Sequence, residues 1–305
     1  MGLNISQEEK MTYITTEDAT LIVEAINNLK QSPDYIKDYI LPIITLILGA
    51  IISASLAYFI ARRTNDRAES IKVEMRRASV INNYSLQAEF CIQSLICIKS
   101  FYQGKLDDDS FRRLATIPPI EGEFALKNLA DITELVFITT DEYMKGSRWN
   151  QITYINLIFE NYKALTKMIK RQKNLKSNLH QRISDLGTSN ISLNIVLNEF
   201  GKAQTIELMQ LTEQIIILVD DLLLFFNDFI QQFPNLAKQR LRKDMPKGIY
   251  TILNFGSSEK SSERSKFFVR SPILNTKIFC ELSGLSKEEA LQIFRPTYTD
   301  NLEQK

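Results

Sequence analysis

The sequence contains one histidine, His180, and lacks the motifs on which many metalloenzymes and nucleotide-binding enzymes depend. A single histidine cannot supply a multi-histidine metal site, nor the two Glu-x-x-His pairs of a di-iron bundle. The phosphate-binding loop GxxxxGK(S/T) and the dinucleotide-binding motif GxGxxG are both absent. We therefore expect a protein that is not an enzyme and that binds no metal ion and no cofactor.

Glycine and proline are also scarce, with 10 and 8 among 305 residues, which favours long helices over a turn-rich sandwich or barrel. The three cysteines, Cys91, Cys97 and Cys280, form no CxxC pair, and the first two do not share a helical face. The composition thus predicts an all-α fold without a disulfide framework, in a reducing compartment.

The chain lacks an excess of charge of either sign, because 37 lysines and arginines balance 36 aspartates and glutamates. A nearly neutral chain has no overall field that would draw it onto nucleic acid. The string FCELSGLSKEEALQIF, beginning at Phe279, has the helix, turn, helix rhythm of some DNA-reading motifs but no basic face. We therefore do not expect nucleic acid as a partner.

The sequence does contain one long uncharged run, LPIITLILGAIISASLAYFI, from Leu41 to Ile60. A helix of this length spans the roughly 30 Å hydrocarbon core of a bilayer. About forty mostly polar residues precede the run, whereas a cleaved signal peptide has its apolar region behind a short basic start. We predict a transmembrane helix at residues 39–61, with the lipid bilayer as a partner. A buried core helix is the alternative.

Cations flank the run mainly on its C-terminal side. Arg62, Arg63 and Arg67 follow it directly, while only Lys30 and Lys37 closely precede it. By the positive-inside rule, the chain is a single-pass protein of the cell's inner membrane, with the N-terminus outside and the C-terminal domain in the cytosol.

Small side chains recur along the run at every fourth residue, namely Gly49, Ser53, Ala57 and Ala61. Such a stripe lets two helix backbones approach closely and gain van der Waals contact. We therefore expect a homo-oligomer with this stripe at its helix-helix interface.

The rest of the chain is predicted to be helical. The whole chain divides into a short extracytoplasmic tail with an amphipathic helix (1–38), the transmembrane helix (39–61), a cytosolic α-helical bundle (62–245), a linker (246–266) and a small C-terminal helical module (267–305). The helix after the anchor continues to about Tyr102, and another spans 121–139. Ser286 and Glu289 form a capping box that begins a short helix in the module.

Residues 150–186 carry an apolar seam of coiled-coil type. The seam is weakened by the polar residues Gln172 and Lys176. Its apolar members recur at seven-residue intervals; they are Ile155, Ile158, Tyr162, Leu165, Ile169, Leu179 and Leu186. This seam is a second candidate surface for self-association.

Ile206 to Phe233 is the most hydrophobic stretch after the anchor, and it contains Asp220 and Asp221. Each acid would cost roughly 2.5 to 3.5 kcal/mol at mid-bilayer, so we predict a buried helix that ends at Pro234. A second membrane helix is the alternative. A weaker hypothesis is an enzyme or divalent-cation site built from acids of this stretch, namely Asp220, Asp221, Asp228, Glu207 and Glu213.

These observations lead to two functional hypotheses. The first is a membrane-anchored scaffold or sensor that self-associates and recruits a cytosolic protein partner at the inner face. The rival is an oligomeric effector that permeabilises the membrane under control of its cytosolic domain, with residues 206–233 as a candidate second membrane segment.

Overall fold

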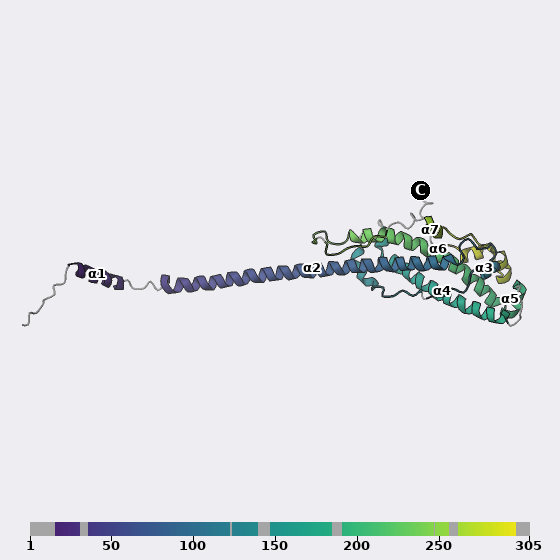
Figure 1. Ribbon diagram of the computed structural model, residues 1–305, viewed down its shortest axis with the longest axis horizontal. Coiled ribbons are helices and arrows are strands. Elements are labelled where there is room, and N and C mark those ends of the chain that lie inside the picture. The colour runs from purple at the N-terminus through teal and green to yellow at the C-terminus, as the bar shows by residue number, and fades with distance from the viewer. Residues whose placement is uncertain are drawn as a thin grey trace, which may run out of the picture. The chain divides into compact units, whose positions relative to one another are not determined.

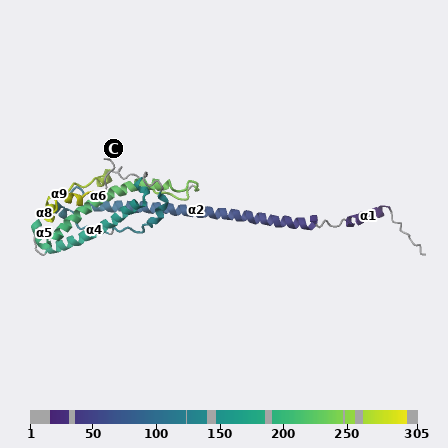
Figure 2. The same ribbon diagram turned by 180° about the vertical axis from the view of Figure 1, so that it is seen from behind.

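The computed structural model describes residues 16–30, 36–122, 124–139, 147–184, 191–246, 248–255 and 262–296. Contacts divide the chain into two units, Met1–Glu69 and Ser70–Lys305. Helix α2 (Leu41–Ser100) begins in the first unit and ends in the second (Figures 1 and 2). Across the described residues the regular structure is helical, and the only β pairing there is an isolated bridge between Asp109 and Asn275. The predicted all-helical class is confirmed in this respect.

The first unit contains α1 (Thr16–Lys30), the π-helical turn η1 (Ile36–Ile40) and the first part of α2. Helix α1 lies where the sequence predicts an amphipathic helix. Every residue of α2 from Leu41 to Glu69 is exposed, so the described part of the chain does not cover this stretch.

Three long helices build the core of the second unit, namely α2 from about Ala78 onward, α4 (Ile152–Ser184) and α6 (Lys202–Lys238). They run side by side in both views (Figures 1 and 2). In α2 the buried residues Ile81, Ala88, Leu95 and others follow helical spacing, which places one face of the helix against α4 and α6.

Aromatic side chains fill the centre of this core. Phe159 of α4 packs edge to face on Tyr84 of α2 and Phe226 of α6, with ring centroids 5.5 and 5.2 Å apart. Phe229 of α6 contacts Trp149 in the same way at 5.1 Å. Such edge-to-face pairs stabilise the core beyond the burial of their area.

Shorter elements surround the three long helices: α3 (Ser110–Thr116), η2 (Ile132–Ile138), η3 (Arg148–Asn150), α5 (Leu193–Phe200), α7 (Ser262–Ser265), η5 (Lys266–Phe268), α8 (Lys277–Ser283) and α9 (Lys287–Ile293). A second apolar cluster joins α8 and α9 to the rest through Phe279 and Phe294, whose rings lie 5.0 Å apart. The capping box of Ser286 and Glu289 begins α9, as predicted.

The prediction of one helix over residues 121–139 is wrong. Residues 124–131 have no regular secondary structure, with Asn128 at a positive φ of 56°, and the 3-10 helix η2 follows them. The reason is a contact with α2, because the Asn83 amide donates to Asn128 O at 3.0 Å and accepts from Ala130 N at 2.9 Å. Gln87 donates to Lys127 O at 2.7 Å, so α2 satisfies the backbone of this segment from its side.

A second irregular segment is held in the same way. Asn82 donates to Thr251 O at 2.8 Å and accepts from Leu253 N at 2.9 Å. Neighbouring asparagines of α2 thus each bind the backbone of an irregular segment, residues 124–131 and residues 248–255.

The structure bears on two other predictions, which concern α4 and α6. The seam of α4 is buried against the same chain from Ile155 to Ile169, so this fold leaves it unavailable to a second copy; Leu186 lies outside the described residues. Helix α6 is buried as predicted, but Pro234 lies inside it rather than at its end. Because Pro234 has no N–H to donate to the Ile230 carbonyl, α6 lacks one intrahelical hydrogen bond near its end.

The predicted boundaries at residues 245 and 266 stay predictions. Residues 247 and 256–261 of the predicted linker and residues 297–305 of the predicted module lie outside the described part of the chain. The described residues beyond 266 pack on α6 and α3 as part of the second unit.

Candidate functional site

The predicted membrane stretch presents an uninterrupted apolar surface. Its large side chains stand free of the described chain, with Leu46, Ile52 and Phe59 exposed to 73%, 64% and 65%. Of the described helices, α2 is the one long and apolar enough to cross a membrane. A large exposed apolar surface of this kind marks a site that contacts lipid or another protein.

The residues predicted to mediate helix pairing lie on this exposed stretch. Gly49, Ser53, Ala57 and Ala61 are all exposed, and a methyl group added at Gly49 would meet no atom within 4 Å. Arg62, Arg63 and Arg67 are exposed directly after it. The positions are therefore accessible, and whether a second helix occupies the stripe stays a prediction.

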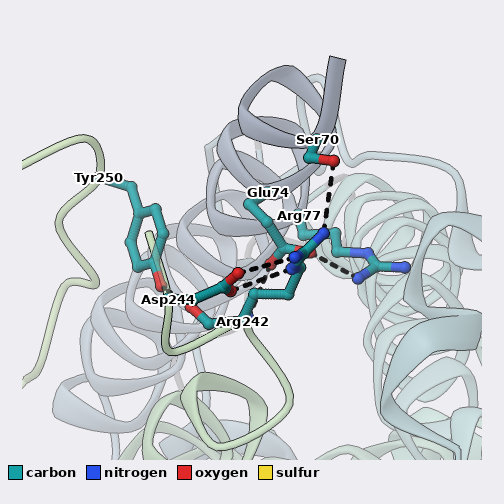
Figure 3. A network of polar contacts seen from close by, with 6 residues as sticks. All are labelled: Ser70, Glu74, Arg77, Arg242, Asp244 and Tyr250. Atoms are coloured by element: carbon teal, nitrogen blue, oxygen red, sulfur yellow. Dashed lines mark hydrogen bonds and ion pairs between the residues drawn. The ribbon is translucent and has the colours of Figure 1, made fainter. Parts of the chain in front are cut away.

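A polar network ties the first turns of the second unit to the chain after α6 (Figure 3). At its centre is Glu74, whose carboxylate is buried. Glu74 accepts from Arg77 Nη1 at 2.7 Å and from the backbone N–H of Arg242 at 3.1 Å. Each of the two Glu74 carboxylate oxygens therefore has a hydrogen-bond donor.

Arg242 extends this network on the surface (Figure 3). Its guanidinium donates two bonds to Asp244, at 3.1 and 2.8 Å, and one to Ser70 Oγ at 3.3 Å. The Tyr250 hydroxyl donates to the Arg242 carbonyl at 3.4 Å. The fork-to-carboxylate pair lies within the turn after α6, and the bonds of Arg242 to Ser70 and Glu74 join that turn to α2.

Buried charges of α6 form the second polar feature. Asp220 accepts from Lys99 Nζ of α2 at 2.5 Å and from the backbone N–H of Ser271 at 2.6 Å. Lys99, which is fully buried, also donates to Val269 O at 2.6 Å. One ion pair thus joins three segments that are far apart in the sequence.

A second buried pair repeats this arrangement two turns earlier on α6. Arg113 of α3 donates to Glu213 Oε2 of α6 at 2.8 Å and to Pro272 O at 2.8 Å. Arg270 pairs with Asp221 at 2.8 Å. We name residues 269–275 the C-terminal strap, because these contacts and the bond from Asn275 N to Asp108 O, 2.9 Å long, hold them along α6 and α3.

The acids that the sequence offers as a metal site are therefore separated and used otherwise. Glu207 pairs with Arg171, and Asp228 accepts from Trp149 Nε1 at 3.0 Å. Within the described ranges, no group of three or more histidine, cysteine or acidic side chains is placed to hold a metal ion.

Sequence reasoning missed the partners of these acids, although a signal was present. Lys99 follows Ile92 and Leu95 by seven and four residues, so it falls at a core position of its helix. A lysine on a core face needs a buried polar partner, and Asp220 is one of the acids that the apolar stretch of α6 offers. The strap itself carried no such signal, because its contacts are largely made by backbone atoms.

Cys91 and His180 lie in different surroundings. Burial raises the pKa of the Cys91 thiol far above its ordinary value, which keeps it protonated, and His180 lies exposed on α4.

Comparison with protein-family models, with curated proteins and with solved structures found no match.

Proposed function

We propose that the chain is a single-pass membrane protein, anchored by residues 39–61, whose helical second unit serves as a scaffold or sensor at the cytosolic face of the cell's inner membrane. The proposal has two parts, the anchor and the recruitment of a partner. The exposed apolar stretch supports the anchor. The helical second unit that follows the stretch supports the recruitment of a partner.

One observation carries the proposal: the apolar run at Leu41–Ile60 is exposed throughout, although the second unit has a complete core of its own. A core helix of a soluble protein would be covered by its chain. Exposing the apolar surface of these twenty uncharged residues to water costs about 25 cal/mol for every Å² left uncovered. A bilayer removes this cost, which supports the anchor.

The cations give the orientation. Arg62, Arg63 and Arg67 follow the anchor, and the positive-inside rule places such residues in the cytosol. The second unit would then face the cytosol, where its free cysteines suit a reducing compartment.

Self-association through Gly49, Ser53, Ala57 and Ala61 completes the proposal. The open surface at Gly49 permits the close approach that small residues allow. The seam of α4 no longer contributes to this proposal, because it packs inside its own chain.

The rival function, a membrane-permeabilising effector, relied on residues 206–233 entering the bilayer. In the second unit these residues form part of α6, and Asp220 and Asp221 there are paired with cations. Moving them into lipid would break both pairs, so the scaffold or sensor is the better supported function.

Membrane flotation tests the anchor. A variant with Leu48→Arg and Ile52→Arg carries two charges at mid-span, each costing roughly 2.5 to 3.5 kcal/mol of insertion free energy. We expect this variant to leave the floating membrane fraction, whereas the unaltered chain stays in it.

A matched control adds the same two charges at exposed positions of the second unit, Val136→Arg and Leu157→Arg. It should float like the unaltered chain. Flotation of the Leu48→Arg, Ile52→Arg variant at the unaltered level would show that another part of the chain binds the membrane.

A further inference from the structure

A pocket of about 340 Å³ opens on the second unit between α3, α4 and the start of α5. Its walls are mainly apolar and include Leu114, Ile117, Leu179, Ile183 and Val196. A mostly apolar pocket of this size with a few polar groups is typical of small-molecule sites.

The polar group inside the pocket is Lys176 of α4, which is only 7% exposed. Its ammonium donates to Leu114 O at 2.8 Å and to Ile117 O, the carbonyls at the end of α3. An ammonium carries three N–H donors, and these two bonds use two of them.

Lys176 differs from the other buried cations of the second unit. Lys99 and Arg113 each contact a carboxylate, whereas no carboxylate of the described residues pairs with Lys176. Carbonyl dipoles at a helix end offset a full charge only in part. A buried charge without an ionic partner is costly, and an anion in the pocket would relieve that cost.

The residues at the edge of the pocket are compatible with an anion. Arg112 and His180 line it, and among the described residues of its lining no side chain is acidic. Arg112 is engaged with Asp107 at 3.2 Å on the outside, so Lys176 is the cation that faces a ligand from within the apolar walls.

We propose that this pocket binds a small carboxylate with an apolar chain, with the carboxylate on Lys176 and the chain between α4 and α5. One buried ammonium matches one carboxylate charge, and apolar walls match an aliphatic chain rather than a strongly hydrated phosphate. Burial lowers the pKa of Lys176 to about 8, so most of the chains carry the charged ammonium at neutral pH.

Hexanoate and its neutral isostere hexanamide test the proposal by calorimetric titration of the full chain in detergent. The two probes share size and chain, and both are soluble enough to leave the micelles largely unoccupied. We expect hexanoate to bind at least about tenfold more tightly than hexanamide, which corresponds to one modest charge interaction. The preference should disappear in Lys176→Met.

Two further variants separate loss of the site from loss of folding. Lys173→Met removes an exposed lysine of the same helix, paired with Glu121, and should bind hexanoate like the unaltered chain. Ala115→Trp fills the exposed rim of the pocket without touching Lys176 and should abolish binding of both probes.

Equal affinity for hexanoate and hexanamide would overturn the proposal, as would a preference for hexanoate that persists in Lys176→Met. Absence of binding by either probe to the unaltered chain would overturn it as well. None of these results bears on membrane flotation, so the tests of this site and of the proposed anchor are independent.

Discussion

Lys99 and Asp220 illustrate how single buried charges connect segments that the sequence keeps apart. The pair is buried on both sides, and each partner also binds the backbone of the C-terminal strap, through Val269 O and Ser271 N. In such a site the loss of one partner costs more than the loss of both, because an unpaired buried charge remains.

Asp220→Asn is therefore expected to lower the free energy of unfolding by about 3 to 5 kcal/mol, because Lys99 is left as a buried cation. Chemical denaturation of the purified chain measures this. The double variant Lys99→Met, Asp220→Leu removes both charges and should recover a large part of the loss. If the single variant were as stable as the unaltered chain, the pair would not hold the strap.

Lys176 gives a pH dependence of the opposite kind to a salt-bridged lysine. Its pKa is about 8 in the folded chain and near 10.5 in the unfolded chain, so between these values the unfolded chain binds more protons. Stability then rises with pH through this window. From pH 7 to pH 9.5 we expect the contribution of Lys176 to become about 2 kcal/mol more favourable.

The measurement is the difference in unfolding free energy between the unaltered chain and Lys176→Met across that pH range, in the absence of ligand. Buried tyrosines such as Tyr84, whose pKa burial raises to about 12, are common to both chains and cancel. Lys173→Met should keep the pH slope of the unaltered chain. Parallel curves for the unaltered chain and Lys176→Met would contradict the assignment.

At the scale of elements, long helices were predictable and the segments between them were not. Helices α1, α2, α4 and α6 were predictable from the sequence, because apolar residues recur along each of them at helical spacing or in one long run. Residues 124–131 resemble a helix locally, but their conformation depends on Asn83 and Gln87, which lie about forty residues earlier. Local pattern carries no information about such distant hydrogen bonds.

The residues of the candidate sites were also only partly predictable from the sequence. Glu213 and Asp220 stand out in the sequence as acids in an apolar helix, but their partners Arg113 and Lys99 lie on other elements and could be found only from the packing. Lys176 stands out in the sequence as a polar residue that weakens the apolar seam of its helix, but its burial beside the carbonyls of Leu114 and Ile117 could be found only from the packing.

Helix pairing by the anchor is a property of one element and can be tested there. Gly49→Ile with Ser53→Ile places two bulky side chains on the stripe, and we expect association in a membrane reporter assay to fall at least about fivefold, because the backbones can no longer approach. Ser55→Ile makes a similar change on the opposite face of the same helix and should leave the signal unchanged. Unaltered association of the double variant would remove the stripe as an interface.

For the whole molecule, the division into two units follows from where apolar surface is buried. Beyond Ser70 the chain buries the apolar side chains of its own core, whereas the side chains of residues 41–60 are all exposed. The sequence predicts this contrast, because an uncharged run flanked by cations differs from an amphipathic helix. It does not predict that the strap and the short helices α8 and α9 pack on α6.

The measurement that tests the central claim most directly is topology mapping in cells, with reporter fusions before Met1, after Arg63 and after Lys305. A single anchor at residues 39–61 with cytosolic flanking cations requires the first fusion to report the outside and the other two to report the cytosol. A Lys305 fusion that reports the outside, or three fusions that all report the cytosol, would contradict the account.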